Sequence, residues 1–395
     1  MPVAETSVWE DLTGQPAAIA TLRAAAAATS SASMTHAWLI TGPPGSGRSN
    51  LAYAFAAALL SRSGPDGDAA TTREVRARTH PDLSVLSTER VIISIDEVRA
   101  LVTSSQFSPS VSRYRVMVIE DADRMSERTS NVLLKALEEP PERTVWILCA
   151  PSDADLLPTI RSRVRTVRLR VPAVADVAEL IARRDGVGMD VAERAARHAQ
   201  SHIGMAHRLA TNDEARARRE ETLELALGIR TVADVVGCAA RMLEIAGADA
   251  KAITDERDAE ERADALQSLG VSEGAAVPAQ LRSQLRQLEE DQKRRATRSL
   301  RDGIDRILTD LLSLYRDVLL LQLDAGAPLV NAELEEKMRR VARASTPAQT
   351  LATMDAVQAA RERIAGNVMP ALALEAMLVS ARRPRNPDGA GRDFR

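Results

Sequence analysis

The sequence predicts an α/β fold with a parallel sheet, followed by two helical domains. Short apolar runs alternate with helical segments up to Pro172, and a glycine-rich loop joins the first apolar run to the next helix. No strand-like run follows Pro172. In this 395-residue chain we expect an α/β domain at 1–170, a small helical domain at 171–212, a larger one at 213–382 and a disordered tail at 383–395.

The expected elements of the α/β domain follow one another in a regular order. After a loop over WEDLTGQP, an alanine-rich helix starts near Ala17. The expected strands are residues 37–41, 81–86, 115–120, 144–150 and 165–171. The expected helices are residues 49–60, 94–106, 125–139 and a short one within 156–163. Ser94 and Glu97 have the spacing of a capping box, Pro140 ends a helix, and residues 63–72 are expected to form a turn-rich linker.

Composition excludes several classes of protein. The net charge is −3, so no global basic field favours nucleic acid. Cys149 and Cys238 are the only cysteines, which gives no disulfide framework and no cysteine-based zinc site, and suits a reducing cytoplasm. The acidic N-terminus is not a signal peptide, and no apolar run is long enough to span a membrane. We therefore expect a cytoplasmic protein without membrane contact.

The glycine-rich loop, GPPGSGRS from Gly42 to Ser49, differs at one position from the phosphate-binding pattern G-x-x-x-x-G-K-[ST]. Gly42, Gly45 and Gly47 let backbone N–H groups converge on phosphate oxygens. Ser49 stands at the position where a hydroxyl would hold Mg²⁺. The lysine of the pattern is Arg48, a planar fork in place of a compact charge. Only four of the 52 Lys and Arg residues are lysine, so drift explains the substitution without preserving the chemistry. The alternative is an ordinary Gly/Pro turn.

Two other positions depart from an ATP-hydrolysing site. Where such sites end a strand with Asp and then Glu, to hold the metal and polarise water, this chain has Glu120 and then Asp121. A catalytic group misplaced by about 1 Å can cost roughly a hundredfold in rate. After the fourth strand, residues 149–151 offer no polar contact to a γ-phosphate, and Ser152 is the nearest candidate. The alternative for the acidic pair is a solvated strand end.

Two basic segments are candidate sites. Arg161, Arg163 and Arg165 alternate around Ser162 after the short helix, where an arginine can reach the γ-phosphate of a neighbouring subunit. An ordinary basic strand entry is the alternative. The charged run at 279–324 is a conceivable DNA contact, although such runs are more often the solvated face of a packed helix.

With these residues in view, the sequence resembles the delta-prime family of bacterial clamp-loader subunits, a branch of the AAA+ ATPases. The resemblance is strong over residues 10–170, fair to about 210 and only architectural beyond. It is carried by LTGQ (12–15), THAWLITGPPGSGR (35–48), THPDL (79–83), IEDADRM (119–125), NVLLKALEEPP (131–141) and LLPTIRSR (156–163). The most discriminating pair is LLKALEEPP with RSR about twenty residues later.

The resemblance implies an AAA+ domain, a helical lid and a C-terminal collar, and it assigns roles to single residues. Ser162 and Arg163 match the family's Ser-Arg-Cys motif, whose arginine acts as a finger in the adjacent ATPase subunit; Val164 replaces the cysteine. Gly204, in SHIGMAHRLA, stands where active subunits have an arginine. The spacer at 61–78 has none of the family's four zinc cysteines, so zinc is not expected.

The implied function is that of a non-hydrolysing structural subunit. Its partners would be the gamma/tau ATPase subunits and delta, and through the complex the sliding clamp and primer-template DNA. No cofactor is required, and ATP or ADP with Mg²⁺ held without hydrolysis is compatible with the loop. The chain would thus be a subunit of the DNA polymerase III holoenzyme without ATPase or polymerase activity of its own. The alternatives are an active gamma/tau-type ATPase and a DNA-binding adaptor.

The C-terminal collar is expected to need an apolar seam between subunits. A leucine-rich stretch supplies residues at helical spacing. They are Ile307, Leu308, Leu311, Leu312, Leu314 and residues 319–321. The alternative is that this face closes only the domain's own core.

Overall fold

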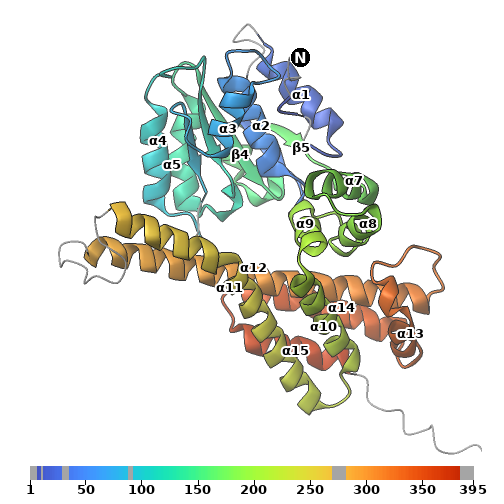
Figure 1. Cartoon of the computed structure of the whole chain (residues 1–395). Coiled ribbons are helices and arrows are strands. Elements are labelled where there is room, and N and C mark those ends of the chain that lie inside the picture. Colours follow the sequence, from blue (N-terminus) through green and yellow to red (C-terminus); the bar gives the residue numbers. More distant parts are fainter. Residues whose placement is uncertain (1–6, 10–11, 29–34, 88–91, 269–281, 383–395) are drawn as a thin grey trace, which may run out of the picture. The chain divides into compact units, whose positions relative to one another are not determined.

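The computed structural model describes residues 7–9, 12–28, 35–87, 92–268 and 282–382 (Figure 1). The chain divides into two compact units, Met1–Thr211 and Asn212–Arg395, each with its own hydrophobic core. The tail expected to be disordered lies outside the described residues. So does part of the charged run at 279–324, since side chains up to residue 291 are not described. Among the described residues, no helix is both long and apolar enough to cross a membrane.

The N-terminal unit is built on a five-stranded sheet in which every pairing is parallel, with the order β2-β3-β4-β1-β5. The strands are β1 Ala37–Thr41, β2 Leu83–Leu86, β3 Arg115–Ile119, β4 Thr144–Ala150 and β5 Arg165–Arg168. All residues of β1, β3 and β4 are buried, as expected for strands covered on both faces. The predicted α/β fold with a parallel sheet is therefore confirmed.

Helices cover both faces of this sheet (Figure 1). On one face, Trp38 and Ile40 of β1 pack with α1 and α2; on the other, Leu39 packs with α4 and α5. The helices are α1 Pro16–Ala26, α2 Arg48–Leu60, α3 Ala69–Arg76, α4 Ile95–Ser105, α5 Glu127–Glu138 and α6 Pro158–Arg161, with short 3₁₀ turns η1 Ala122–Arg124 and η2 Asp153–Asp155. Alternate residues of β1, β3 and β4 thus serve two separate cores.

Local signals placed most of these elements correctly. Ser94 and Glu97 form the predicted capping box of α4, and α5 ends two residues before Pro140. The linker expected at 63–72 is wrong in part, because it contains the start of α3. Asp68 caps this helix by accepting a hydrogen bond from the Thr71 N–H, and Val75 is its buried anchor.

The THPDL segment has a structural role. Asp82 is fully buried and accepts backbone hydrogen bonds from Ser110, Val111 and Ser112 at 2.5–2.8 Å. Although burial alone would raise the pKa of this carboxyl, the three N–H donors hold it below its ordinary value. His80 is also buried, and its Nδ1 accepts from the Asp82 N–H at 3.1 Å. These contacts tie the entry of β2 to that of β3.

Three short helices complete the N-terminal unit. They are α7 Val174–Asp185, α8 Met189–His198 and α9 Ile203–Thr211. Asp185, at the end of α7, accepts from His207 Nδ1 of α9 at 2.7 Å and pairs with its neighbour Arg184 at 2.9 Å. The predicted small helical lid is therefore present and internally connected.

The C-terminal unit is all-helical in its described part, as predicted. It contains α10 Asp213–Gly228, α11 Val232–Ser268, α12 Arg282–Gln322, η3 Ala332–Leu334, α13 Glu335–Arg343, α14 Pro347–Ala365 and α15 Pro370–Ala381. Its core holds a buried polar centre at Asp317 of α12, which accepts from the Asn331 N–H at 2.7 Å and from Asn331 Nδ2 at 3.0 Å. Arg219 of α10 reaches Asn331 Oδ1 and Asp310. This network links α10 and α12 to the segment before η3.

The apolar seam expected between subunits is wrong for half of its residues. Ile307, Leu308, Leu311 and Leu314 are buried in the unit's own core, while Leu312 and residues 319–321 are half-buried. An apolar stripe has the same helical period whether it faces its own chain or another. The alternative, that this face closes the domain's own core, is the one the structure supports.

Candidate functional site

The glycine-rich loop lies between β1 and α2, at the carboxyl edge of the sheet where parallel α/β folds bind ligands. Gly45 (φ 77°) and Gly47 (φ 90°) adopt the left-handed conformation that favours glycine. Gly47 is the N-cap of α2, so the first N–H groups of the helix border the loop. The buried Ser46 hydroxyl inside the loop has no hydrogen-bond partner among the described residues. These features suit an anion at the loop.

Arg48 is engaged by the loop itself. Its Nη1 donates to the carbonyl oxygen of Gly42 at 2.8 Å, so the side chain folds back across the loop that it follows. Ser49 is half-buried in the first turn of α2. The arginine therefore braces the backbone at the position where the pattern places a lysine.

The lid touches the loop directly. The Ile203 N–H, at the start of α9, donates to the Gly45 carbonyl at 3.2 Å. A Cβ at position 45 would lie 2.1 Å from the imidazole of His202, so only glycine admits this approach. His202 Nδ1 in turn accepts from the Met205 N–H at 3.2 Å and caps α9. Gly204 lies beside the same imidazole, and with no side chain it offers the loop no charge.

Glu120 follows β3 and is already paired. Its Oε1 accepts from the Tyr53 hydroxyl of α2 at 2.5 Å and lies 3.0 Å from Arg78 Nη2. Only 13% of the Glu120 side chain is exposed. Burial first, and then the hydrogen bond to Glu120, raise the pKa of Tyr53 above its ordinary value, so its hydroxyl remains a donor. The carboxylate expected at the metal position is therefore neutralised by protein groups.

Asp121 and its neighbours complete the acidic edge. Asp121 Oδ2 lies 3.6 Å from Arg124 Nε, and 20% of its side chain is exposed. Burial raises the pKa of Asp123, with the charge of Asp121 adding to the shift and those of Arg124 and Arg48 opposing it. The structure thus brings Arg48 close enough to the acidic edge for their charges to interact.

The end of β4 meets the loop through its backbone, because the Ala150 and Pro151 carbonyls accept from the Gly42 N–H, and it brings no charged side chain there. Cys149 is fully buried, and burial raises the pKa of its thiol to about 12, with the nearby charge of Arg48 opposing the shift. Ala150 is buried beside Thr41 in the sheet. Ser152 Oγ accepts from the Ala154 N–H and caps η2, so this hydroxyl is used locally.

Arg163 and Ser162 form a separate surface site at the end of α6. The Arg163 guanidinium pairs with Glu138 of α5 and donates to the Thr159 carbonyl at 2.7 Å. Ser162 Oγ accepts from Arg163 at 3.0 Å and donates to the Thr159 carbonyl. One third of the Arg163 side chain is exposed, and Arg161 is exposed beside it. The ion pair joins LLKALEEPP to RSR, the two segments that the sequence singled out.

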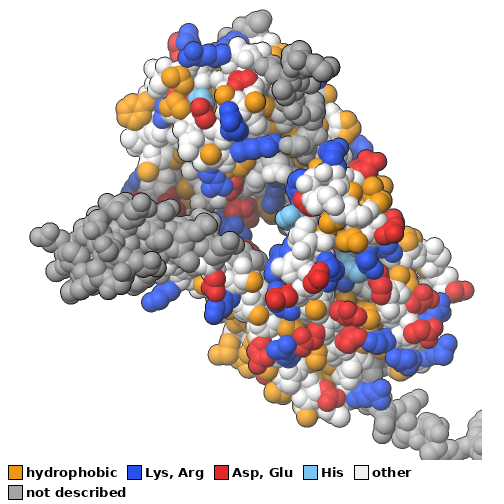
Figure 2. All heavy atoms as spheres, viewed as in Figure 1, with side chains coloured by type: hydrophobic (Ala, Val, Ile, Leu, Met, Phe, Trp, Pro, Cys, Tyr) orange, Lys and Arg blue, Asp and Glu red, His pale blue; other side chains and the backbone are white. Residues whose placement is uncertain are grey.

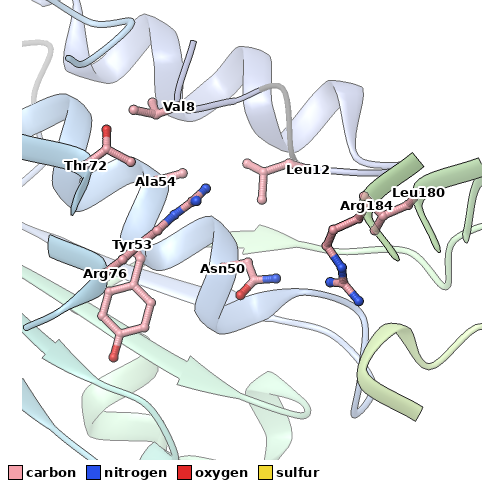
Figure 3. Close-up of a pocket in the computed structure, with 9 residues that line it drawn as sticks. All are labelled: Val8, Leu12, Asn50, Tyr53, Ala54, Thr72, Arg76, Leu180 and Arg184. Carbon is pink, nitrogen blue, oxygen red and sulfur yellow. The ribbon is translucent and has the colours of Figure 1, made fainter. Parts of the chain in front are cut away.

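A pocket of about 340 Å³ lies beside α2 in the N-terminal unit (Figure 3). Its lining begins at Asn50, the residue after Ser49, and reaches α3 and the lid helix α7. The lining residues are Val8, Leu12, Asn50, Tyr53, Ala54, Thr72, Arg76, Leu180 and Arg184. Apolar residues line part of this pocket, and Arg76 and Arg184 supply positive charge, so the pocket suits a small molecule that carries negative charge.

Four residues that contact the candidate site residues were not predicted from the sequence. They are Tyr53, Arg78, His202 and Glu138. No local signal marks the pair at Glu120, since Tyr53 is 67 residues and Arg78 42 residues away along the chain. Within the described residues, no cluster of three or more His, Cys, Asp or Glu side chains could hold a metal ion. The expectation that the chain carries no zinc stays a prediction, and metal analysis of the purified protein checks it.

A parallel α/β unit with a glycine-rich loop between β1 and α2, followed by three short helices, is the fold expected from the AAA+ resemblance. Residues 14–173 match the model of a family described as DNA polymerase III, delta subunit. The chain is 36% identical over 154 residues to DNA polymerase III subunit delta′ of Pseudomonas aeruginosa, covering 38% of this chain and 47% of the relative. Over this region the chain is similar to the delta and delta′ subunits of DNA polymerase III.

Other relatives cover a similar stretch. DNA polymerase III subunit gamma/tau of Mycobacterium tuberculosis is 30% identical over 165 residues, 40% of this chain and 28% of the relative. The chain thus spans less than half the length of these two curated relatives. A solved gamma subunit-related protein of Thermotoga maritima covers 92% of this chain and 98% of its own, at 16% identity and a TM-score of 0.42. That likeness is too distant to carry an argument.

Proposed function

We propose that this chain is a non-hydrolysing structural subunit of a DNA polymerase III clamp loader. The observation that carries the proposal is the pairing around the loop. Arg48 is bound to the Gly42 carbonyl, and Glu120 to Tyr53 and Arg78, so neither is presented to a phosphate or to water as ATP hydrolysis requires. The relationship to delta′ and gamma/tau subunits over residues 14–173 supports the clamp-loader assignment.

Arg163 is proposed to act as an arginine finger on a neighbouring ATPase subunit. Its present partner is Glu138, and the two side chains are 33% and 46% exposed. An ion pair this exposed contributes only about 0–1 kcal/mol, so exchanging Glu138 for a γ-phosphate costs little. The guanidinium would then offset the charge that develops in the transition state. Ser162 accepts from the guanidinium and is a positioning residue.

The proposed partners are the gamma/tau ATPase subunits and delta, with the sliding clamp and primed DNA reached through the complex in the cytoplasm. No nucleotide is required for this role. ATP or ADP remains compatible with the loop, whose glycines and helix N-terminus are intact, and the pocket next to Asn50 has room for the rest of a nucleotide.

The DNA-binding adaptor is the weaker alternative. Figure 2 shows Lys and Arg side chains interspersed with Asp and Glu over the face of the C-terminal unit in view. A surface of alternating sign gives little of the phosphate attraction that dominates DNA binding.

Two measurements on the full chain test this proposal. Affinity purification from cells should recover gamma/tau and delta, identified by mass spectrometry. The purified chain alone should hydrolyse ATP at a negligible rate. Turnover near that of AAA+ motors would instead favour the active gamma/tau-type reading, and recovery of DNA without these subunits would favour the adaptor.

A further inference from the structure

The ion pair between Arg78 and Glu120 occupies the place where an ATPase of this class would hold a divalent cation. Glu120 ends β3 beside the loop, and both Tyr53 and Arg78 contact the same oxygen, Oε1. Ile119 of β3 pairs with Leu148 of β4, and Cys149 Sγ lies 4.0 Å from the Arg48 carbonyl oxygen, so Glu120 and Arg48 both border the end of β4. The pair is therefore part of the loop's immediate surroundings.

The position of Arg78 is fixed by the spacer. After α3 ends at Arg76, residue 78 adopts a left-handed conformation (φ 58°) that side chains rarely take. Its N–H still donates to the Val75 carbonyl, and Val75 is fully buried. The guanidinium lies 5.7 Å from the centre of the Tyr53 ring, in cation–π range. Ring and carboxylate together hold this cation at the edge of the site.

This arrangement conflicts with Mg²⁺ binding. Magnesium demands nearly ideal octahedral oxygen ligands at about 2.0–2.1 Å. Oε1 already accepts two hydrogen bonds, and the positive charge of Arg78, with that of Arg48 nearby, opposes a divalent cation. Along this edge Arg48, Arg78 and Arg124 equal Glu120, Asp121 and Asp123 in number, so no net negative charge is left for a metal to neutralise. The residues present therefore do not fit the metal that the loop pattern implies.

We propose that Arg78, positioned with Tyr53, replaces the divalent cation as the counter-charge of Glu120, so that this loop binds any nucleotide without Mg²⁺. Two separate residues then prevent metal-dependent nucleotide binding at the loop: Arg48 within the loop, and Arg78 at the end of the spacer 61–78. Reverting Arg48 alone cannot restore a metal-dependent site. This inference is independent of the role of Arg163.

The test measures binding of fluorescent MANT-ADP to the full chain, in Mg²⁺ and in EDTA. The wild type and Arg48→Lys should bind equally under the two conditions. Arg48→Lys/Arg78→Ala should bind at least about tenfold more tightly in Mg²⁺, because Glu120 becomes available to the metal. Arg48→Lys/Tyr53→Phe should show a smaller gain in the same direction, and it keeps the ring that packs under Arg78.

The matched control is Arg48→Lys/Arg73→Ala. Arg73 is an exposed arginine on α3, the helix that precedes Arg78, and its Nε donates to the Ala69 carbonyl in its own turn. This control should bind equally in Mg²⁺ and EDTA. The proposal is overturned if the wild type or Arg48→Lys alone binds MANT-ADP more tightly in Mg²⁺ than in EDTA. It is also overturned if neither Arg48→Lys/Arg78→Ala nor Arg48→Lys/Tyr53→Phe binds MANT-ADP more tightly in Mg²⁺, and this includes the case in which neither variant binds it at all. Melting temperatures identify any variant that loses its fold. If Arg48→Lys/Arg78→Ala does not fold, the Mg²⁺ dependence of Arg48→Lys/Tyr53→Phe decides whether the proposal holds.

Discussion

Single side chains determine what the glycine-rich loop can do. Arg48 donates to Gly42 within its own loop, and Glu120 is held by Tyr53 and Arg78. The residue types at positions 48 and 120 can be compared directly with the motifs of an ATP-hydrolysing site. The sequence alone therefore predicts that both positions differ from those motifs. Their partners come from distant segments and became visible only in the folded unit.

Gly45 is the residue on which contact between loop and lid depends. A Cβ there would lie 2.1 Å from the His202 ring, and φ is 77°. Gly45→Ala should therefore lower the free energy of unfolding of the N-terminal unit by the strain of a left-handed residue, about 1–2 kcal/mol, and by a further ~1–3 kcal/mol for overpacking. Fluorescence of Trp9, Trp38 and Trp146, all in this unit, measures it during denaturation.

Gly186 provides the matched control for this substitution. It has a similar φ of 68°, but a Cβ there would meet nothing within 4 Å. Gly186→Ala should show only the strain of about 1–2 kcal/mol. Equal losses for the two variants would mean that the contact between His202 and the loop does not stabilise the unit.

At the scale of elements, the sequence predicts the strands and most helices of the sheet, because apolar alternation, capping residues and prolines act locally. It misses α3, whose eight residues contain one buried anchor, Val75. It also misassigns the leucine-rich face of α12 to a partner subunit. A stripe of Ile307, Leu311 and Leu314 reveals a buried face, but its sequence cannot say which chain buries it.

The polar centre of α12 should be essential to the C-terminal unit. Asp317 is fully buried, and Asp317→Ala would leave the Asn331 N–H without its acceptor. We expect this change to lower the free energy of unfolding by about 3–5 kcal/mol. Circular dichroism, to which the long helices of this unit contribute, should report the loss, while the tryptophans of the other unit should not.

Asp305, on the same helix, is the control for this prediction. It forms a bidentate ion pair with Arg361, but its side chain is 52% exposed. Asp305→Ala should cost less than about 1 kcal/mol. If the two variants lose equal stability, the buried network has no special role.

At the scale of the whole molecule, the chain combines a loop whose catalytic positions are paired internally with a half-buried arginine, Arg163, in the turn after α6. The site residues were predicted from motif spacing and family resemblance, and their roles remain proposals. What the sequence could not predict is the pairing of Arg163 with Glu138, 25 residues earlier in the chain, which joins the turn after α6 to the end of α5. This pair keeps the arginine ordered at the surface without burying it.

The central claim is that Arg163 acts on a neighbour's ATP. In a clamp loader reconstituted from this chain with gamma/tau and delta subunits, the proposed partners, Arg163→Ala should leave assembly intact, lower the DNA- and clamp-stimulated ATPase partially, and impair clamp loading more severely. Such arginines contribute roughly 10³–10⁵ in rate in the best-studied NTPases, but only one of several sites would lose it here. Arg163→Lys should not fully rescue the defect, because a point charge lacks the fork geometry.

The measurement that tests this claim most directly is the clamp-loading rate of the Arg163→Ala complex beside that of an Arg161→Ala complex. Arg161 is exposed, lies two residues away and is outside the matched motif, so its loss should have the smaller effect. The account predicts a severe loading defect for Arg163→Ala with normal assembly. Loading at the wild-type rate, or a larger defect for Arg161→Ala, would contradict it.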